Sequence, residues 1–136
     1  MTHEIESLIR HRLGRAWEAI EEASILLDSG HVNTFVNRLY YACFYSVSAL
    51  LLTKDLSSAK HSGVRSFFHQ NFIKPGIVSI ELGQLYDRLF RNSQKGDYAD
   101  FVRFDVDEVK PWYDEARGFV DAIVKIVEGC MKKGEG

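Results

Sequence analysis

An arginine and two tyrosines share one side of an otherwise apolar segment, residues 35–52. Arg38, Tyr41 and Tyr45 are spaced by three and four residues, which places them on one face of a helix. A guanidinium keeps its proton, so Arg38 must meet a carboxylate, a carbonyl group, water or an incoming anion. A tyrosine-lined arginine suits a planar anion or a nucleic-acid base. The same spacing suits an arginine whose stem packs on aromatic rings, and both interpretations stay open at this point.

A second basic group lies in residues 61–69, where His61, Arg65 and His69 recur every four residues. The spacing predicts one stripe of a helix, which is either a phosphate-binding surface or a solvated one. The two histidines would lie about 12 Å apart along the helix axis, too far to chelate one ion. The sequence also lacks a glycine-rich phosphate loop, HExxH, CxxC and a nucleophile elbow. We therefore predict neither a metal site nor a cofactor.

A third group lies where a helix is expected to end. Arg91 and Asn92 precede Gly96, and Asp97 and Tyr98 follow it. These residues concentrate hydrogen-bonding groups in a short stretch. Positive charge near a helix C-terminus is also stabilised by the helix dipole, so cations here need no functional explanation.

Composition sets the class of protein. The chain has 136 residues, 46% of them hydrophobic and 26% charged, which is typical of a single globular domain. The net charge of −2 argues against broad attraction to nucleic acid, and we expect no DNA partner. Any contact with RNA or a nucleotide would come from a local patch.

The location predicted for the protein is the cytoplasm. Cys43 and Cys130 are far apart on apolar helix faces and are interpreted as buried thiols in a reducing compartment. The acidic N-terminus does not resemble a signal peptide. Polar residues interrupt the segment 35–52, so we predict neither a membrane span nor a membrane partner.

Helical periodicity runs through the whole chain. A first helix is expected from Ile5 to Leu27, ending at Gly30, and a second up to Leu52 with Asn33 or Thr34 as its cap. After a polar connection, a third helix is expected over 60–73, before Pro75-Gly76.

Two further helices are expected after residue 78. One is capped by Ser79 and broken at 96–98. The last runs from Val109 to Cys130, with Pro111 in its first turn or at a kink, and residues 132–136 form a frayed tail. The predicted fold class is all-α: one domain over 1–136, an up-and-down bundle of about five helices.

Three short segments resemble motifs of the HEPN family of prokaryotic helical domains. They are NRLYYACF at 37–44, KHSGVRSFF at 60–68 and QKGDYADF at 94–101. The resemblance covers nearly the whole chain. It implies a helical bundle like that of nucleotidyltransferase substrate-binding subunits, and a homodimer. It also implies a small nucleotidyltransferase as partner, in a module resembling a toxin–antitoxin system. Many family members cut RNA without a metal ion.

The resemblance further implies a location for nuclease chemistry. Family nucleases use an arginine, a polar residue and, after a short gap, a histidine that moves protons on the ribose hydroxyl. Arg91 and Asn92 match the first half, whereas Gly96, Asp97 and Tyr98 occupy the positions allowed for the histidine. Ordinary pKa values of about 3.9 for aspartate and about 10 for tyrosine make both poor proton shuttles at neutral pH. In the related family motif that ends His-x-Tyr, Tyr98 matches the tyrosine and Gly96 occupies the place of the histidine. The resemblance thus implies that the arginine, the asparagine and the tyrosine are kept while the proton shuttle is missing.

His61 or His69, from another helix, is an alternative shuttle that the spacing does not require. Three functions therefore stay open. The first, which we rank highest, is a homodimeric partner of a nucleotidyltransferase that binds nucleotide or RNA without cutting it. The second is a metal-independent, toxin-type ribonuclease using Arg91-Asn92 with a non-standard proton shuttle. The third is a bundle that binds a small molecule or nucleotide at Arg38, Tyr41 and Tyr45. Whether the protein is an enzyme is left undecided by the sequence.

Overall fold

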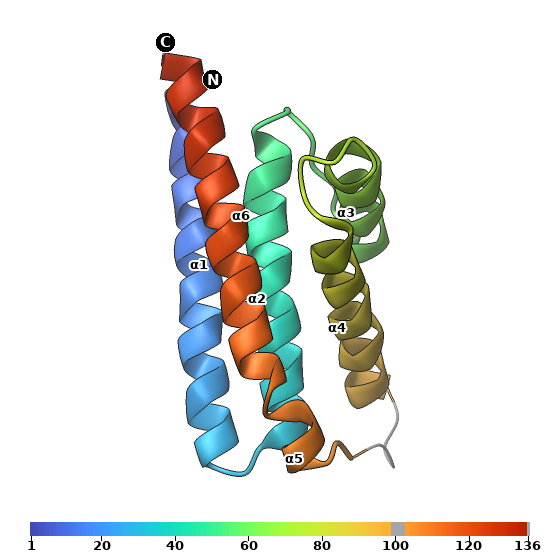
Figure 1. Cartoon of the computed structure of the whole chain (residues 1–136). Coiled ribbons are helices and arrows are strands. Elements are labelled where there is room, and N and C mark those ends of the chain that lie inside the picture. The colour runs from blue at the N-terminus through green and yellow to red at the C-terminus, as the bar shows by residue number, and fades with distance from the viewer. Residues whose placement is uncertain (99–102, 136) are drawn as a thin grey trace.

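The helices of this chain form an elongated bundle (Figure 1). The computed structural model describes the backbone of residues 1–98 and 103–135 and the side chains of residues 1–95 and 103–133. Its elements are α1 (His3–Asp28), α2 (Val32–Leu52), α3 (His61–Phe68), a π-helical turn η1 (His69–Ile73), α4 (Ile80–Tyr98), α5 (Val106–Val109) and α6 (Trp112–Glu135). The described part of the chain contains no strand, and the predicted all-α bundle is confirmed.

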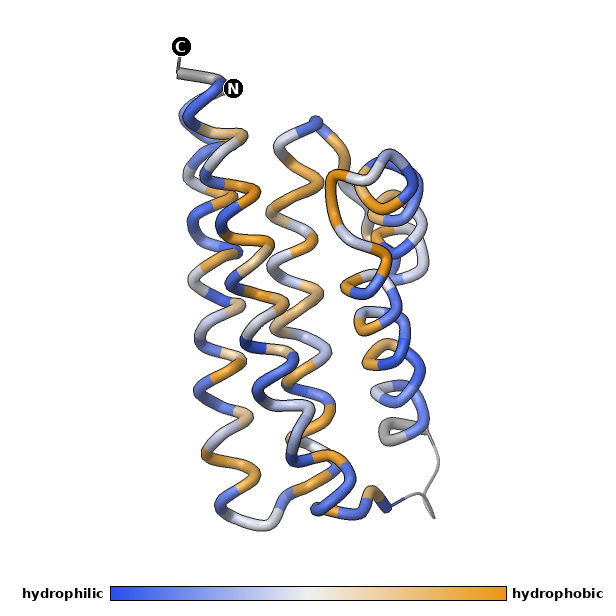
Figure 2. The backbone as a smooth tube through the Cα atoms, viewed as in Figure 1, coloured by the Kyte–Doolittle hydropathy of each residue, from blue (hydrophilic) through white to orange (hydrophobic). Residues whose placement is uncertain are grey.

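Helix α2 lies in the middle of this bundle. It contacts α1, α4 and α6 along its length, and α3 near its C-terminal half (Figure 1). Thirteen of its 21 residues are buried. By length and composition α2 could cross a membrane, but 72% of its most apolar window is buried inside the protein, as in a core helix. Figure 2 shows hydrophobic residues along the inward sides of the helices and hydrophilic ones along the outward sides.

The first helix begins at His3, two residues before the predicted Ile5, whereas its end and the start of α4 lie where the sequence predicts them. Thr2 caps α1 through its side chain, which accepts a hydrogen bond from the Ile5 N–H. Gly30 follows α1 with φ at +80°, a left-handed conformation that glycine adopts without strain. Ser79 accepts from the Leu82 N–H at the start of α4, as expected.

The second helix begins earlier than predicted. It starts at Val32, and the cap position is His31, which makes no side-chain cap hydrogen bond. Asn33 lies inside the helix instead of capping it, and its side-chain oxygen accepts from the Phe104 N–H at 3.2 Å. This tertiary contact joins residues 71 positions apart, so local capping rules could not find it.

The other helix limits also need correction. Helix α4 continues through Gly96 to Tyr98, where a break was predicted. The last helix starts at Trp112, directly after Pro111, and Val109 belongs to the separate short helix α5. Helix α6 extends to Glu135, so residues 132–135 continue the helix. The predicted helix 60–73 is present as α3 followed by η1.

The core centres on the α2 side chains that face the neighbouring helices. Phe35, Leu39 and Leu50 are fully buried, as are Phe68 of α3 and Phe119 of α6. Of the two cysteines, Cys43 is buried as predicted, whereas Cys130 is only partly buried. The termini lie side by side at one end of the bundle (Figure 1).

Replacing Leu39 with alanine should lower the free energy of unfolding by about 2–5 kcal/mol, because it leaves a cavity in the centre of the core. Urea unfolding followed by circular dichroism measures the change. The matched control is Leu8→Ala on α1, where the side chain is 39% exposed, and this change should stay within about 0.5 kcal/mol. Equal effects at both positions would contradict the central place assigned to α2.

Candidate functional site

The predicted Arg38 group is assembled on the seam between α1 and α2. The Arg38 guanidinium carbon lies 4.7 Å from the centre of the Tyr41 ring. Its Nη2 donates to the Asn37 side-chain oxygen at 3.1 Å, and Nη1 lies 3.9 Å from a Glu22 carboxylate oxygen. The Arg38 side chain keeps only 21% of its surface exposed. The sequence left open whether Arg38 packs on aromatic rings or binds an anion. The structure is compatible with both, because Arg38 packs on the Tyr41 ring and part of its side chain stays exposed between α1 and α2.

Helix α1 supplies a second arginine to the same seam. Arg15 donates to the Tyr45 hydroxyl at 3.4 Å and to Glu18 at 2.8 Å, and its guanidinium carbon lies 5.2 Å from the Tyr45 ring centre. Hydrogen bonds to Tyr45 and Glu18 raise the pKa of Arg15. The Tyr41 and Tyr45 rings are 5.9 Å apart. We call the series Arg38, Tyr41, Tyr45 and Arg15 the arginine–tyrosine row.

His61, at the start of α3, adjoins this row. Its ring stacks on Phe44 with centres 4.3 Å apart, and it lies 5.6 Å from the Tyr41 ring. Its Nδ1 is 2.8 Å from the Tyr40 hydroxyl. Burial raises the pKa of Tyr40, so this phenol keeps its proton at neutral pH and can donate it to Nδ1. His61 is thus held against α2 by one hydrogen bond and one stacked ring.

Arg65 of α3 and His69 of η1 form a separate cluster with Asp87 of α4. Arg65 Nε lies 2.6 Å from an Asp87 carboxylate oxygen, and His69 Nε2 lies 2.9 Å from the same oxygen. Burial alone would raise the pKa of Asp87, but the hydrogen bonds from Arg65 and His69 outweigh it, and the pKa is lowered. An open groove of about 650 Å³ lies over this cluster and is also lined by Ser62 and Lys74.

A glycine lets the π-helical turn approach α4 beside Asp87. A Cβ added at Gly83 would lie 3.2 Å from His69 Cε1 and 3.2 Å from Ile73 Cδ1. The contacts along α4 therefore occur in a fixed order, with His69 at Gly83 and Asp87, and Arg65 at Asp87 and Phe90. The predicted stripe is divided, since His61 joins α2 while Arg65 and His69 join α4.

The residues proposed for nuclease chemistry are only partly visible. Arg91 is exposed and makes no hydrogen bond, ion pair or ring contact with any residue in the described ranges. Asn92 donates to the Arg88 carbonyl oxygen at 2.8 Å, a bond within its own helix. The side chains of Asp97 and Tyr98 lie outside the described residues.

Neither candidate replacement for the missing histidine bonds to Arg91. His69 binds Asp87, one helical turn before Arg91, and His61 binds Tyr40 on α2. Across residues 1–95 and 103–133, no hydrogen bond or ring contact joins a histidine to Arg91. Burial also raises the pKa values of Cys43 and Tyr86, so neither is an acid or a nucleophile at neutral pH.

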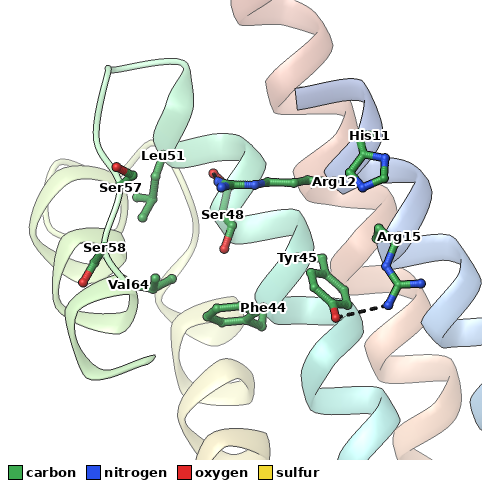
Figure 3. A pocket seen from close by; sticks show the side chains of 10 residues that line it. All are labelled: His11, Arg12, Arg15, Phe44, Tyr45, Ser48, Leu51, Ser57, Ser58 and Val64. Carbon is green, nitrogen blue, oxygen red and sulfur yellow. Dashed lines mark hydrogen bonds between the residues drawn. The ribbon is translucent and has the colours of Figure 1, made fainter. Parts of the chain in front are cut away.

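A pocket that sequence reasoning missed lies beside the row. It has a volume of about 280 Å³, and ten residues of α1, α2, α3 and the α2–α3 loop line it: His11, Arg12, Arg15, Phe44, Tyr45, Ser48, Leu51, Ser57, Ser58 and Val64 (Figure 3). The signal for it was the dense basic run at 10–15, RHRLGR, on an otherwise acidic helix. As for metals, no three His, Cys, Asp or Glu side chains gather closely enough to hold an ion in the described ranges.

A model of the HEPN domain matches residues 9–127. The chain belongs to the HEPN family. It is 46% identical over 130 residues to a "UPF0332 protein" of Thermotoga maritima, which covers 96% of this chain and 98% of that protein. It is also 31% identical over 133 residues to "Putative toxin MJ0142" of Methanocaldococcus jannaschii, covering 97% of this chain and 88% of that protein. A second relative there, "Putative toxin MJ0605", is 34% identical over 128 residues, 94% of this chain and 92% of that protein.

The family predicted from the three short segments is confirmed over most of the chain. In this HEPN protein the first segment supplies Arg38 and Tyr41 of the row, and the second supplies His61 and Arg65. The third segment lies largely outside the described residues. The relatives whose names contain the word toxin support a toxin-like HEPN protein.

The Asp87 cluster makes a pH-dependent contribution to stability. Because the folded-state pKa of Asp87 is lowered, its stabilisation is present above about pH 4 and is lost as the pH falls through the folded-state value. Asp87→Asn should therefore lower the free energy of unfolding at pH 7 by about 1–2 kcal/mol. The difference between variant and wild type should shrink when urea unfolding is repeated at about pH 3.

The matched control is Asp121→Asn, which removes an exposed carboxylate 3.0 Å from Lys125 on α6. An exposed pair at this spacing contributes only about 0.3–0.5 kcal/mol. A pH-independent effect of Asp87→Asn would contradict the assignment.

Proposed function

We propose that this HEPN protein is the toxin-type member of a two-protein module, acting as a homodimer in the cytoplasm with a small nucleotidyltransferase as its partner. We further propose that it binds RNA or a nucleotide on the arginine–tyrosine row and does not cut RNA at Arg91. The observation that carries the binding proposal is the row of two adjacent phenol rings with a guanidinium at each end, along the α1–α2 seam.

The row has the chemistry of a single-strand binding surface. RNA-binding proteins stack bases on aromatic rings or on guanidinium planes, and they hold the backbone with cations. Arg15 and Arg38 keep 38% and 21% of their side-chain surface exposed, so both are within reach of a ligand. With a net charge of −2, the whole protein provides no general attraction, and binding depends on this local surface.

Two carboxylates on α1 flank the row without blocking it. Glu18 and Glu22 keep 60% and 48% of their side-chain surface exposed, and the Glu22–Arg38 separation of 3.9 Å is long for an ion pair. Exposed pairs contribute about 0–1 kcal/mol. A hydrogen bond to a charged phosphate contributes about 1.5–3 kcal/mol, so a phosphate can compete for these guanidiniums.

The nuclease alternative has weaker support in the described residues. Cleavage of RNA at the ribose hydroxyl needs a group that exchanges a proton near neutral pH. His61 and His69 are bound to Tyr40 and Asp87, and within the described ranges neither makes a hydrogen bond or ring contact with Arg91.

Binding of single-stranded RNA should depend on Arg38 and not on Arg91. Arg38→Ala should weaken binding of a fluorescein-labelled oligoadenylate by about 1–3 kcal/mol, through loss of a stacking plane and a phosphate contact. Arg91→Ala removes the same charge from an exposed position and should change the affinity little. Fluorescence anisotropy at two salt concentrations measures both. The slope of log K against log salt should fall by about 0.7 for Arg38→Ala.

The same RNA incubated in EDTA tests the alternative directly. We expect intact RNA with wild type. Cleavage that disappears in Arg91→Ala would establish the ribonuclease function, and equal RNA affinities of the two arginine variants would overturn the row as the binding surface.

The partner proposal is tested separately by size-exclusion chromatography with light scattering. The protein alone should elute with the mass of two chains, since a self-complementary two-fold contact is the usual form of a small oligomer. Mixed with the product of an adjoining nucleotidyltransferase gene, it should co-elute as a larger complex. Elution as a monomer that does not shift on mixing would contradict both the homodimer and the partnership.

A further inference from the structure

Arg12 stands apart from the other partly buried arginines of this protein. Its Nη1 donates to the Ser48 carbonyl oxygen at 3.3 Å, and it forms no ion pair with any carboxylate in the described ranges. The comparable arginines each pair with an acid: Arg15 with Glu18, Arg38 with Glu22, Arg65 with Asp87 and Arg88 with Glu115. Burial lowers the pKa of Arg12, which marks a guanidinium that has lost water without gaining an anion.

This unpaired charge lines the pocket beside the row. In Figure 3, the Arg12 side chain extends from α1 across α2 toward the loop that carries Ser57 and Ser58, while Arg15 turns to Tyr45. His11 lies on the same side as these arginines. No carboxylate is among the residues that line the pocket, so its lining is basic and hydroxylic over an apolar floor.

The loop wall of the pocket is fixed before any ligand arrives. A Cβ added at Gly63 would lie only 2.1 Å from the Ser58 Oγ, so the glycine lets this loop pack directly on α3. The Ser58 hydroxyl also accepts a hydrogen bond from the Lys60 N–H at 3.2 Å. A preformed wall lowers the ordering cost of binding.

We propose that this pocket binds the terminal phosphate of an RNA chain or a nucleotide, with Arg12 as its principal ligand and Arg15 as the second cation. The volume of about 280 Å³ is just below the usual range for small-molecule sites, about 300–1,000 Å³. It admits a phosphate group with the atoms next to it. A phosphate inside a strand would need room for the chain on both sides.

The pocket deepens the proposed function and rests on it for the identity of the ligand. Arg15 and Tyr45 belong both to the pocket and to the arginine–tyrosine row. A strand lying on the row would therefore place its end at Arg12. A free mononucleotide has the same phosphate monoester and is the second possible source.

Two matched pairs of ligands test this proposal with the full-length protein. The first pair is adenosine monophosphate against adenosine, measured by isothermal titration calorimetry. The second is a 5′-phosphorylated against a 5′-hydroxyl oligoadenylate, measured by fluorescence anisotropy. Wild type should prefer the phosphorylated member of at least one pair by about tenfold or more, as expected for charge-assisted hydrogen bonds. Preference in the RNA pair alone identifies a strand end, and preference in the mononucleotide pair alone identifies a free nucleotide.

Arg12→Gln should abolish the preference for phosphate while the affinity for the 5′-hydroxyl oligoadenylate is kept. Arg10→Gln, which removes an exposed arginine from the same helix outside the pocket, should retain the preference. The melting temperature of Arg12→Gln should be equal to or above that of wild type, because an unpaired, partly buried charge is removed. Arg12→Lys keeps the charge without the planar fork and should show a reduced preference.

Three results would overturn the proposal: no preference for phosphate in either pair, a preference that survives Arg12→Gln, or a loss of stability in both Arg12 variants with the preference intact. Failure of the 5′-hydroxyl oligoadenylate to bind wild type would count against the row alone. The mononucleotide pair would still decide the pocket.

Discussion

Helix α2 is buried between α1, α4 and α6. Its polar side chains can therefore reach solvent or a polar partner only along the seams where α2 meets these helices. Arg38, Tyr41 and Tyr45 lie on the seam with α1, and Tyr40 reaches α3. A buried hydroxyl or guanidinium without a hydrogen-bond partner lowers the stability of the fold by more free energy than most surface contacts add. These polar groups of α2 are therefore paired across helix boundaries, and the pairs define where a ligand can approach.

The basic groups of the surface fall into two classes, those with a carboxylate partner and those without one. Asp87 binds both Arg65 and His69, so one carboxylate already offsets part of the positive charge in the groove above it. Arg12 and the pocket around it lack such a carboxylate. The regions around Arg65 and around Arg12 both carry several basic residues. Because Arg65 already has a carboxylate partner and Arg12 has none among the pocket residues, the Arg12 pocket is the better site for an anion.

Periodicity was enough to predict an all-helical bundle, because α1 and α6 bury regular apolar stripes and α2 is apolar on most of its sides. The helix start at Val32 was missed, since Asn33 bonds to Phe104 in the distant part of the chain. The sequence also placed His61 and His69 in one stripe, whereas each binds a partner on a different helix. His61 bonds to Tyr40 of α2 and His69 to Asp87 of α4, and such tertiary partners cannot be predicted from spacing along one helix. The basic run at 10–15 was the only hint of the pocket at Arg12, and it did not suffice, since the α2–α3 loop must first fold back to form the wall of the pocket.

The π-helical turn at His69–Ile73 holds more residues per turn than the α-helix before it. Deleting one residue there would restore an α-helical path and turn α3 by about 100° about its axis relative to the connection at 74–79, which leads to α4. Arg65 would then leave Asp87 even though no contacting side chain had been changed. The extra residue of this turn is thus part of what keeps Arg65 and His69 aimed at the same carboxylate oxygen of Asp87.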